Sequence, residues 1–148
     1  MWRLNLVVAL ALSAMPCHGA AVQKSEPANR PALSANELED LQRQADKGDV
    51  NAMYNLGWMY AEGSGVPKDE KQAVEWFRKA AELGDANAML GLGLMCMDGR
   101  GVAKDEKQAV EWFRKAADLG NPAAMSNLGW MYANGRGVAK DEKQAVEW

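Results

Sequence analysis

The twelve residues Gly-Val-Ala-Lys-Asp-Glu-Lys-Gln-Ala-Val-Glu-Trp occupy positions 101–112 and recur unchanged at positions 137–148. A third copy at positions 65–76 differs only in Pro67, which replaces alanine. Successive copies are offset by 36 residues, as their starts at 65, 101 and 137 show. A fixed period of this kind is the signature of a repeat array, in which no unit can bury its apolar face alone. The sequence therefore predicts stacked units instead of one globular core.

The composition limits the classes of partner. Of the 148 residues, 48% are hydrophobic, the net charge is −3 and the pI is near 5.2. This apolar content is enough for a folded array. A nucleic-acid-binding domain would need a basic face, which a weakly acidic chain with interspersed charges does not offer. We therefore expect no nucleic-acid partner.

Residues 1–21 have the pattern of a secretory signal peptide. Arg3 provides a basic start, residues 6–15 are apolar, and small residues follow at positions 19–21. The apolar run is too short to span a bilayer comfortably, and cleavage is expected after position 19 or 21. A lipid anchor at Cys17 would need a small residue just before it, a place that Pro16 fills poorly. We expect a periplasmic or secreted protein without a membrane span.

A polar segment and a short helix should precede the array. Residues 22–33 contain two prolines and no period, which predicts a flexible linker. Ser34-Ala-Asn-Glu37 then matches a capping box, in which each side chain accepts from the other residue's backbone. The helix should run to about Lys47, with Gly48 just beyond its end. We assign residues 34–48 to an N-terminal capping helix with one apolar stripe and one charged face.

The rest of the chain divides into units at 49–84, 85–120 and 121–148, the last of them incomplete. Each unit is predicted to hold two helices, the first of which should span about 50–61, 86–97 and 122–133 behind an N-cap residue. The recurring apolar residues of these first helices fall at i, i+1, i+4 and i+5, on one face of an α-helix. In the first unit they are Ala52, Met53, Leu56 and Gly57.

A Gly-x-Gly-Val loop joins the two helices of each unit. Its first glycine, at positions 63, 99 and 135, suits the left-handed conformation that ends a helix. Asp69 and its equivalents should cap the second helices. On these helices, Glu75–Lys79 and the equivalent pair one unit later should form i,i+4 ion pairs.

The repeated pattern Ala-x-x-x-Leu-Gly-x-Met-Tyr-x-x-Gly-x-Gly-Val-x-x-Asp-x-x-x-Ala-x-x-Trp-Phe-x-Lys-Ala-Ala-x-x-Gly resembles the Sel-one-like repeat (SLR), a relative of the tetratricopeptide repeat. The resemblance covers residues 45–148. It implies an all-α fold, an α/α solenoid whose first helices line a concave face, and an adaptor role that is often extracytoplasmic in bacteria. The first-unit residues that match are Ala52, Leu56, Gly57, Met59, Tyr60, Gly63, Gly65, Val66, Asp69, Ala73, Trp76, Phe77, Lys79, Ala80, Ala81 and Gly84. Because Trp76 and its equivalents Trp112 and Trp148 follow this pattern, the resemblance implies that they belong to the core.

The chain departs from the family pattern in two places. The second unit has Leu94, Cys96 and Met97 where its neighbours have Trp, Tyr and Ala. The chain also lacks the paired cysteines that form a disulfide in each unit of some secreted relatives. The third unit stops at Trp148 inside its second helix, which would be marginal alone. Either the sequence is a fragment, or the last turns fray and leave apolar surface exposed.

The sequence offers no constellation typical of an enzyme. Its one histidine, His18, lies in the predicted leader, so the mature chain would lack the commonest general base and nitrogen ligand. Cys96 has no histidine partner and is interpreted as a small apolar filler. The Gly-x-Gly loops follow helices instead of strands, which does not fit a phosphate site. We expect no catalytic residue, no metal site and no cofactor.

Variation between units is concentrated on the first helices, whereas the second helices are almost invariant. A surface that recognises a partner needs different side chains at different places, and Trp and Asn provide apolar area and hydrogen bonds. The candidate partner-binding residues are therefore Tyr54, Asn55, Trp58, Leu94, Asn127 and Trp130. The alternative for the two tryptophans is that they only fill space between units.

These patterns predict a non-enzymatic adaptor that binds a protein or peptide along its first helices. Two alternatives stay open. One is an enzyme such as a cell-wall or β-lactam hydrolase, an activity attributed to some SLR proteins, although the Ser-x-x-Lys motif of such hydrolases is absent. The other is a structural spacer, or a unit that self-associates through its uncapped C-terminal end.

Overall fold

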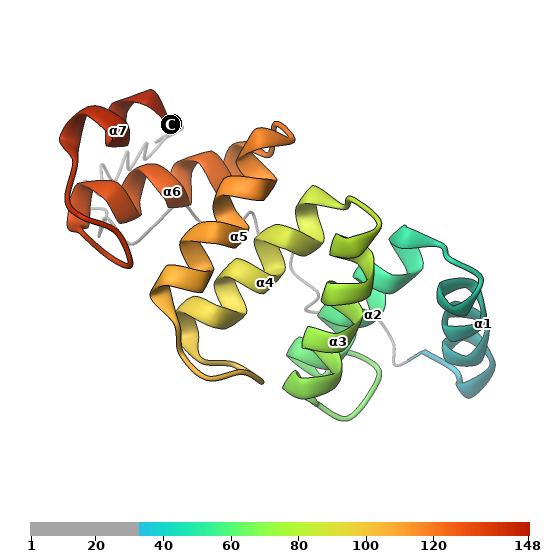
Figure 1. Cartoon of the computed structure of the whole chain (residues 1–148). Coiled ribbons are helices and arrows are strands. Elements are labelled where there is room, and N and C mark those ends of the chain that lie inside the picture. Colours follow the sequence, from blue (N-terminus) through green and yellow to red (C-terminus); the bar gives the residue numbers. More distant parts are fainter. Residues whose placement is uncertain (1–32) are drawn as a thin grey trace, which may run out of the picture.

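The computed structural model describes residues 33–148, which form seven α-helices and no strand. The predicted signal peptide and all but the last residue of the predicted linker lie outside the described residues. Each helix packs against the next one along the chain, and α2 also touches α4. Figure 1 shows an elongated stack with α1 and α7 at opposite ends, which is an α/α solenoid. The helices are α1 (Ala35–Asp46), α2 (Val50–Glu62), α3 (Glu70–Glu82), α4 (Ala86–Asp98), α5 (Glu106–Asp118), α6 (Pro122–Asn134) and α7 (Glu142–Glu147).

The first helices α2, α4 and α6 begin and end at the residues that their caps dictate. The side chains of Asp49, Asp85 and Asn121 accept from the backbone N–H three residues later, as predicted. Each helix ends one residue beyond its predicted bound. The next residue is a glycine in the left-handed conformation, which stops the helix. The predicted capping box is also confirmed, because Ser34 and Glu37 bond each other's backbone.

Helix α1 occupies the place that a second helix would take in a preceding unit. The amide of Gln42 donates to the Tyr60 hydroxyl, 18 residues later. The Arg114 guanidinium of α5 donates to the Tyr132 hydroxyl across the same separation. Leu41 precedes Phe77 by one 36-residue period and packs against the same core. α1 therefore covers α2 as α5 covers α6, but with an exposed face that is polar.

Close contact between a glycine and a phenylalanine holds the two helices of a unit together. Phe77 of α3 is fully buried, and a Cβ placed on Gly57 of α2 would lie 2.6 Å from its ring. A Cβ on Gly91 of α4 would lie 3.3 Å from the same ring, so Phe77 sits between two units. Glycine costs about 1 kcal/mol in a helix relative to alanine. The recurrence of glycine here is explained because no side chain fits at this place.

Two expectations for the second helices α3 and α5 were wrong. Trp76 and Trp112 are half-buried at the edge of the core, not inside it. The Lys79 ammonium lies 4.1 Å from the centre of the Trp76 ring, and Lys115 lies 4.4 Å from that of Trp112. Neither lysine forms the predicted i,i+4 ion pair, because the tryptophan ring one turn away attracts the cation instead.

The outer side of the third unit differs from the equivalent sides of the first two. Val146 of α7 is 86% exposed, whereas its equivalents Val74 and Val110 are 5% and 3% exposed. The difference follows from neighbours, since α4 and α6 cover α3 and α5. Trp148 is half-buried instead of being part of the core as expected, and its indole N–H has no acceptor within residues 33–148. None of the helices described has the length and apolar character required to cross a bilayer.

Candidate partner-binding surface

Three equivalent positions on the first helices stay partly open along the whole array. Trp58 of α2, Leu94 of α4 and Trp130 of α6 are each half-buried and pack against the core with part of the side chain. Because the units repeat one hairpin, these side chains follow one another along one side of the stack. We call the exposed and half-buried side chains of α2, α4 and α6 around them the first-helix surface.

Trp58 belongs to an aromatic cluster that fixes its orientation. Its ring meets Phe77 edge to face, with centroids 5.4 Å apart, and meets Tyr54 in the same way at 6.3 Å. Such pairs contribute about 0.5–1.5 kcal/mol beyond the burial of their area. The Trp58 side chain is therefore held in one place while part of it faces solvent. A rigid, half-open aromatic ring is a favourable anchor for a partner.

Trp130 has a different neighbour. The Arg136 guanidinium lies over its ring, 5.5 Å from the ring centre, and also bonds the Glu106 carboxylate. In the middle unit, the smaller Leu94 stands at the position that Trp58 and Trp130 occupy in the outer units. Trp58 packs on Phe77 of the second helix of its own unit, so part of its ring does fill space in the stack.

The other candidates are placed less uniformly. Asn55 is exposed, whereas its equivalents Gly91 and Asn127 are buried, because α4 and α6 each follow another first helix in the stack and α2 does not. Asn127 is 7% exposed, and its amide donates to the Ala123 carbonyl. A partner would therefore meet little of Asn127. Tyr54 is half-buried and reaches the surface beside Trp58.

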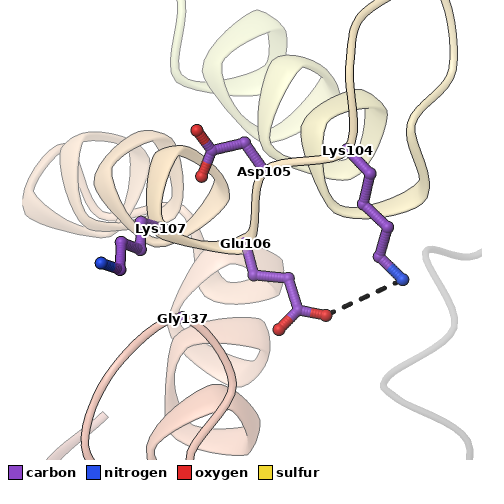
Figure 2. A pocket seen from close by; sticks show the side chains of 5 residues that line it. All are labelled: Lys104, Asp105, Glu106, Lys107 and Gly137. Atoms are coloured by element: carbon purple, nitrogen blue, oxygen red, sulfur yellow. Dashed lines mark ion pairs between the residues drawn. The ribbon is translucent and has the colours of Figure 1, made fainter.

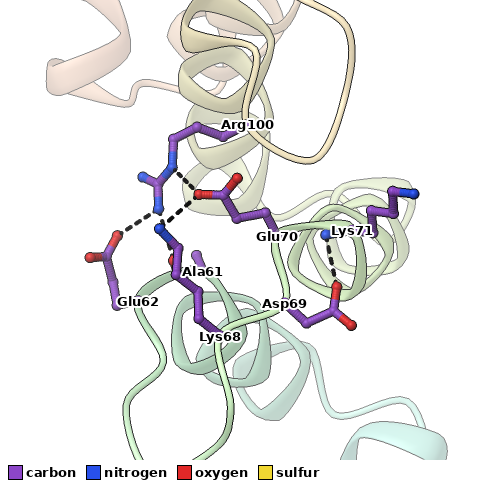
Figure 3. Close-up of polar contacts among 7 residues, drawn as sticks. All are labelled: Ala61, Glu62, Lys68, Asp69, Glu70, Lys71 and Arg100. Atoms are coloured by element: carbon purple, nitrogen blue, oxygen red, sulfur yellow. Dashed lines mark hydrogen bonds and ion pairs between the residues drawn. The ribbon is translucent and has the colours of Figure 1, made fainter.

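An arginine in the second unit's Gly-x-Gly loop clamps that unit to the first, as Figure 3 shows. Arg100 donates to the Glu70 carboxylate at 2.9 Å, to the Ala61 carbonyl at 2.8 Å and to the Glu62 carboxylate at 3.2 Å. The adjacent Gly101 allows the loop to approach, because a Cβ there would lie 2.1 Å from the Glu70 carbonyl oxygen. Sequence reasoning missed this clamp.

The clamp recurs one unit later. Arg136 bonds Glu106, and Gly137 lies against the Glu106 backbone as Gly101 lies against Glu70. The constant spacing of 30 residues between each glutamate and its arginine was the signal that could have revealed both pairs. Hydrogen bonds from Arg100 and then Lys68 lower the pKa of Glu70, and the bond from Arg136 lowers the pKa of Glu106.

Two open hollows lie beside these clamps. One of about 490 Å³ is lined by residues 68–71 and Gly101, and the other of about 480 Å³ by residues 104–107 and Gly137. Figure 2 shows the second, in which Lys104 and Glu106 pair across the rim. Asp69 and Asp105 are both engaged as helix caps. The carboxylates that line the hollows thus already have structural roles, and the charges there are of both signs.

Cys96 takes the place of the tyrosine in the middle unit. It is 2% exposed, and its thiol donates to the Gln108 side chain at 3.1 Å. Burial, reinforced by Asp105, raises the pKa of this thiol. A raised pKa and burial make a poor nucleophile, which agrees with the interpretation as a filler. No group of three or more metal-ligating side chains comes together within residues 33–148.

Comparisons with known proteins identify the repeat. The Sel1 repeat model matches residues 50–85, 86–121 and 122–148. Proteins with this repeat are generally protein-interaction scaffolds. Among curated proteins, the Secretory immunoglobulin A-binding protein EsiB of Escherichia coli is 46% identical over 48 residues, which cover 32% of this chain and 10% of EsiB.

Solved structures agree on the fold. The structure of c5321, a protective antigen of uropathogenic Escherichia coli with an SLR fold, matches with a TM-score of 0.73 and 46% identity, over 75% of this chain and 24% of that one. A Sel1 repeat protein from Oxalobacter formigenes matches with a TM-score of 0.68 and 44% identity, over 76% of this chain and 85% of its own. Helicobacter pylori cysteine rich protein B gives a TM-score of 0.60 at 27% identity, over 74% and 84% of the two chains.

The chain spans only about a tenth of EsiB and a quarter of c5321, so the similarity concerns the repeat array and not those whole proteins. Within the array, the family model covers every residue from 50 to 148, and the stacked helices have the architecture that it implies. The chain belongs to the Sel1 repeat family.

Proposed function

We propose that this protein is a non-enzymatic scaffold outside the cytoplasm that binds a protein or peptide partner on its first-helix surface. The observation that carries the proposal is the row of half-buried apolar side chains at equivalent positions, Trp58, Leu94 and Trp130. Scattered exposed apolar residues are normal on a protein surface, but apolar side chains that recur at the same place in each stacked unit suit an interface. Tyr54 and Asn55 extend the row on α2.

The relatives support the setting of this function. EsiB is named for binding secretory immunoglobulin A, and c5321 is described as a protective antigen. Both descriptions suit proteins that are exported from the bacterial cytoplasm. The pattern of residues 1–21 supports export independently. A fusion of residues 1–33 to alkaline phosphatase, which is active only after export, tests this part. An inactive but stably expressed fusion would refute the proposed location.

The binding surface is tested with the double variant Trp58→Ala/Trp130→Ala of the full chain. Immobilised parent protein is used to capture extracytoplasmic proteins, and each captured protein is then purified and titrated against both forms. Loss of anchor tryptophans typically costs 2 kcal/mol or more, so the Kd should rise at least about tenfold. Purified secretory immunoglobulin A is the first defined partner to titrate, because of the likeness to EsiB.

The matched control is Trp76→Ala/Trp112→Ala, which removes two half-buried tryptophans from the second helices. Both double variants lose two half-buried tryptophan side chains, and circular dichroism verifies that each is folded. We expect the control to bind like the parent. If Trp58→Ala/Trp130→Ala binds the partner as tightly as the parent does, the first-helix surface is not the binding site.

A further inference from the structure

We infer that the partner segment recognised by the first-helix surface presents a lysine or arginine beside an apolar side chain. This inference rests on the proposed function and adds the chemistry of the partner. It follows from which charges and hydrogen-bonding groups the three first helices offer to solvent, and from which of those groups are already engaged within the stack.

The first helices carry two carboxylates, Glu62 of α2 and Asp98 of α4, and no cation. In α2, α4 and α6 there is no lysine or arginine, whereas α1, the second helices and the loops carry all the positive charges of residues 33–148. Three arginines from other elements reach α2 or α6: Arg100 is held by Glu62 and Glu70, Arg136 is held by Glu106 and Trp130, and Arg114 donates to the Tyr132 hydroxyl. An acidic partner would therefore find no free cation on these three helices.

Each first helix repeats one arrangement near its C-terminal end. An apolar side chain is followed four residues later, on the same face, by an exposed side chain with an acceptor oxygen. The pairs are Trp58 with Glu62, Leu94 with Asp98, and Trp130 with Asn134. The carbonyl end of a helix carries partial negative charge, which adds to the attraction for a cation. An apolar contact and a site for a positive charge thus lie one turn apart.

Asp98 is the carboxylate in this row that remains free. Glu62 already pairs with Arg100, and the Asn134 amide donates to the Trp130 carbonyl of its own helix. Asp98 is exposed and forms no ion pair within residues 33–148. On α6, the hydroxyl of the exposed Ser126 donates to the Pro122 carbonyl of its own helix, and its oxygen remains free to accept a hydrogen bond. A cationic donor from the partner satisfies Asp98, while the neighbouring apolar side chain packs against Leu94.

The test selects a random heptapeptide library, displayed on phage, against the immobilised full chain and against its Asp98→Lys variant. We expect the parent to enrich peptides with Lys or Arg next to Leu, Met or an aromatic residue. The variant should lose this preference and enrich Asp or Glu instead, because the sign of the charge is reversed. A purely structural role for Asp98 would not reverse the preference. Lysine near a helix C-terminus is favourable, so the variant should fold.

The matched control is Asp118→Lys, which changes the exposed last residue of α5 in the same way. It should select the same peptides as the parent. One selected peptide and its Lys→Glu or Arg→Glu version are then titrated by fluorescence anisotropy. The charge reversal should weaken binding about twofold to fivefold, as expected for an exposed ion pair, and added salt should reduce the difference.

The outcomes separate this inference from the proposed function. If the parent and the Asp98→Lys variant select the same peptides, or the parent selects acidic ones, the inference is wrong. If those peptides nevertheless lose binding in Trp58→Ala/Trp130→Ala, the proposed function stands without it. If the parent enriches no peptide more strongly than Trp58→Ala/Trp130→Ala does, both the inference and the proposed function are wrong.

Discussion

Replacing Gly57 with alanine should destabilise the array, although glycine is the poorer helix former. At an exposed position inside a helix, this change would stabilise by about 1 kcal/mol. Here the added methyl group would lie 2.6 Å from two carbons of the Phe77 ring, and ordinary carbon–carbon contacts need about 3.5 Å or more. One of the two groups must therefore move by nearly 1 Å.

The ring of Phe77 has no free space to move into. It is fully buried, its far side already faces Gly91, and Tyr54 and Trp58 pack on it with centroids 6.0 and 5.4 Å away. Overpacking a core of this kind costs about 1–3 kcal/mol. After subtraction of the gain in helix propensity, we expect a net loss of about 1 kcal/mol, or a decrease in Tm of about 3–6 °C.

Urea and thermal unfolding followed by circular dichroism measure this loss. The matched control is Gly91→Ala on the other side of the ring, where the methyl group would lie 3.3 Å away and a small shift relieves the contact. That variant should be close to neutral. In a Phe77→Leu background, Gly57→Ala should no longer destabilise, because the ring is gone. A Gly57→Ala protein that is more stable than the parent would refute the explanation of the recurring glycine.

Three further predictions concern the joints between units and the middle unit. Arg100→Ala should lower the free energy of unfolding by about 1–2 kcal/mol in urea titrations, because the buried Ala61 carbonyl and Glu70 lose their donor; equal stability would show that the clamp is dispensable. Because the pKa of Glu70 is lowered in the folded protein, its stabilisation is present above the unfolded value of 4.5 and is lost as the pH falls below it. Glu70→Gln should therefore flatten the decrease in stability between pH 5 and 3, and an unchanged slope would contradict the pairing. Cys96 should react with a thiol reagent far more slowly in the native protein than in urea, since it is buried and its pKa is raised; comparable rates would show that the middle unit opens readily.

The local structure could be read from the sequence because its causes are local. Ser34, Asp49 and Gly63 cap helices through contacts with residues at most five positions away, so their roles follow from short patterns. The ends of the first helices were predicted to within one residue for the same reason. The ion pair predicted for Lys79 failed because two partners at similar separation compete for it, and Trp76 prevailed.

The candidate site was predictable in kind but not in detail. The position shared by Trp58, Leu94 and Trp130 was identified because it varies between otherwise similar units, and the structure places all three half-open. Asn127 could not be separated from Asn55 by sequence, because the two have the same place in their units. Only the stack buries one and exposes the other, since α6 follows another first helix and α2 does not.

The sequence by itself determined that this protein is a stack of 36-residue helical hairpins, because a unit that repeats its apolar face must cover it with a copy of itself. The tertiary structure decided how the units are joined, through Phe77 between Gly57 and Gly91 and through Arg100 on Glu70. It also decided which side chains remain open to a partner. These features depend on contacts between residues 14 to 39 positions apart, and the distance between such residues is set by packing and not by the local pattern of the chain.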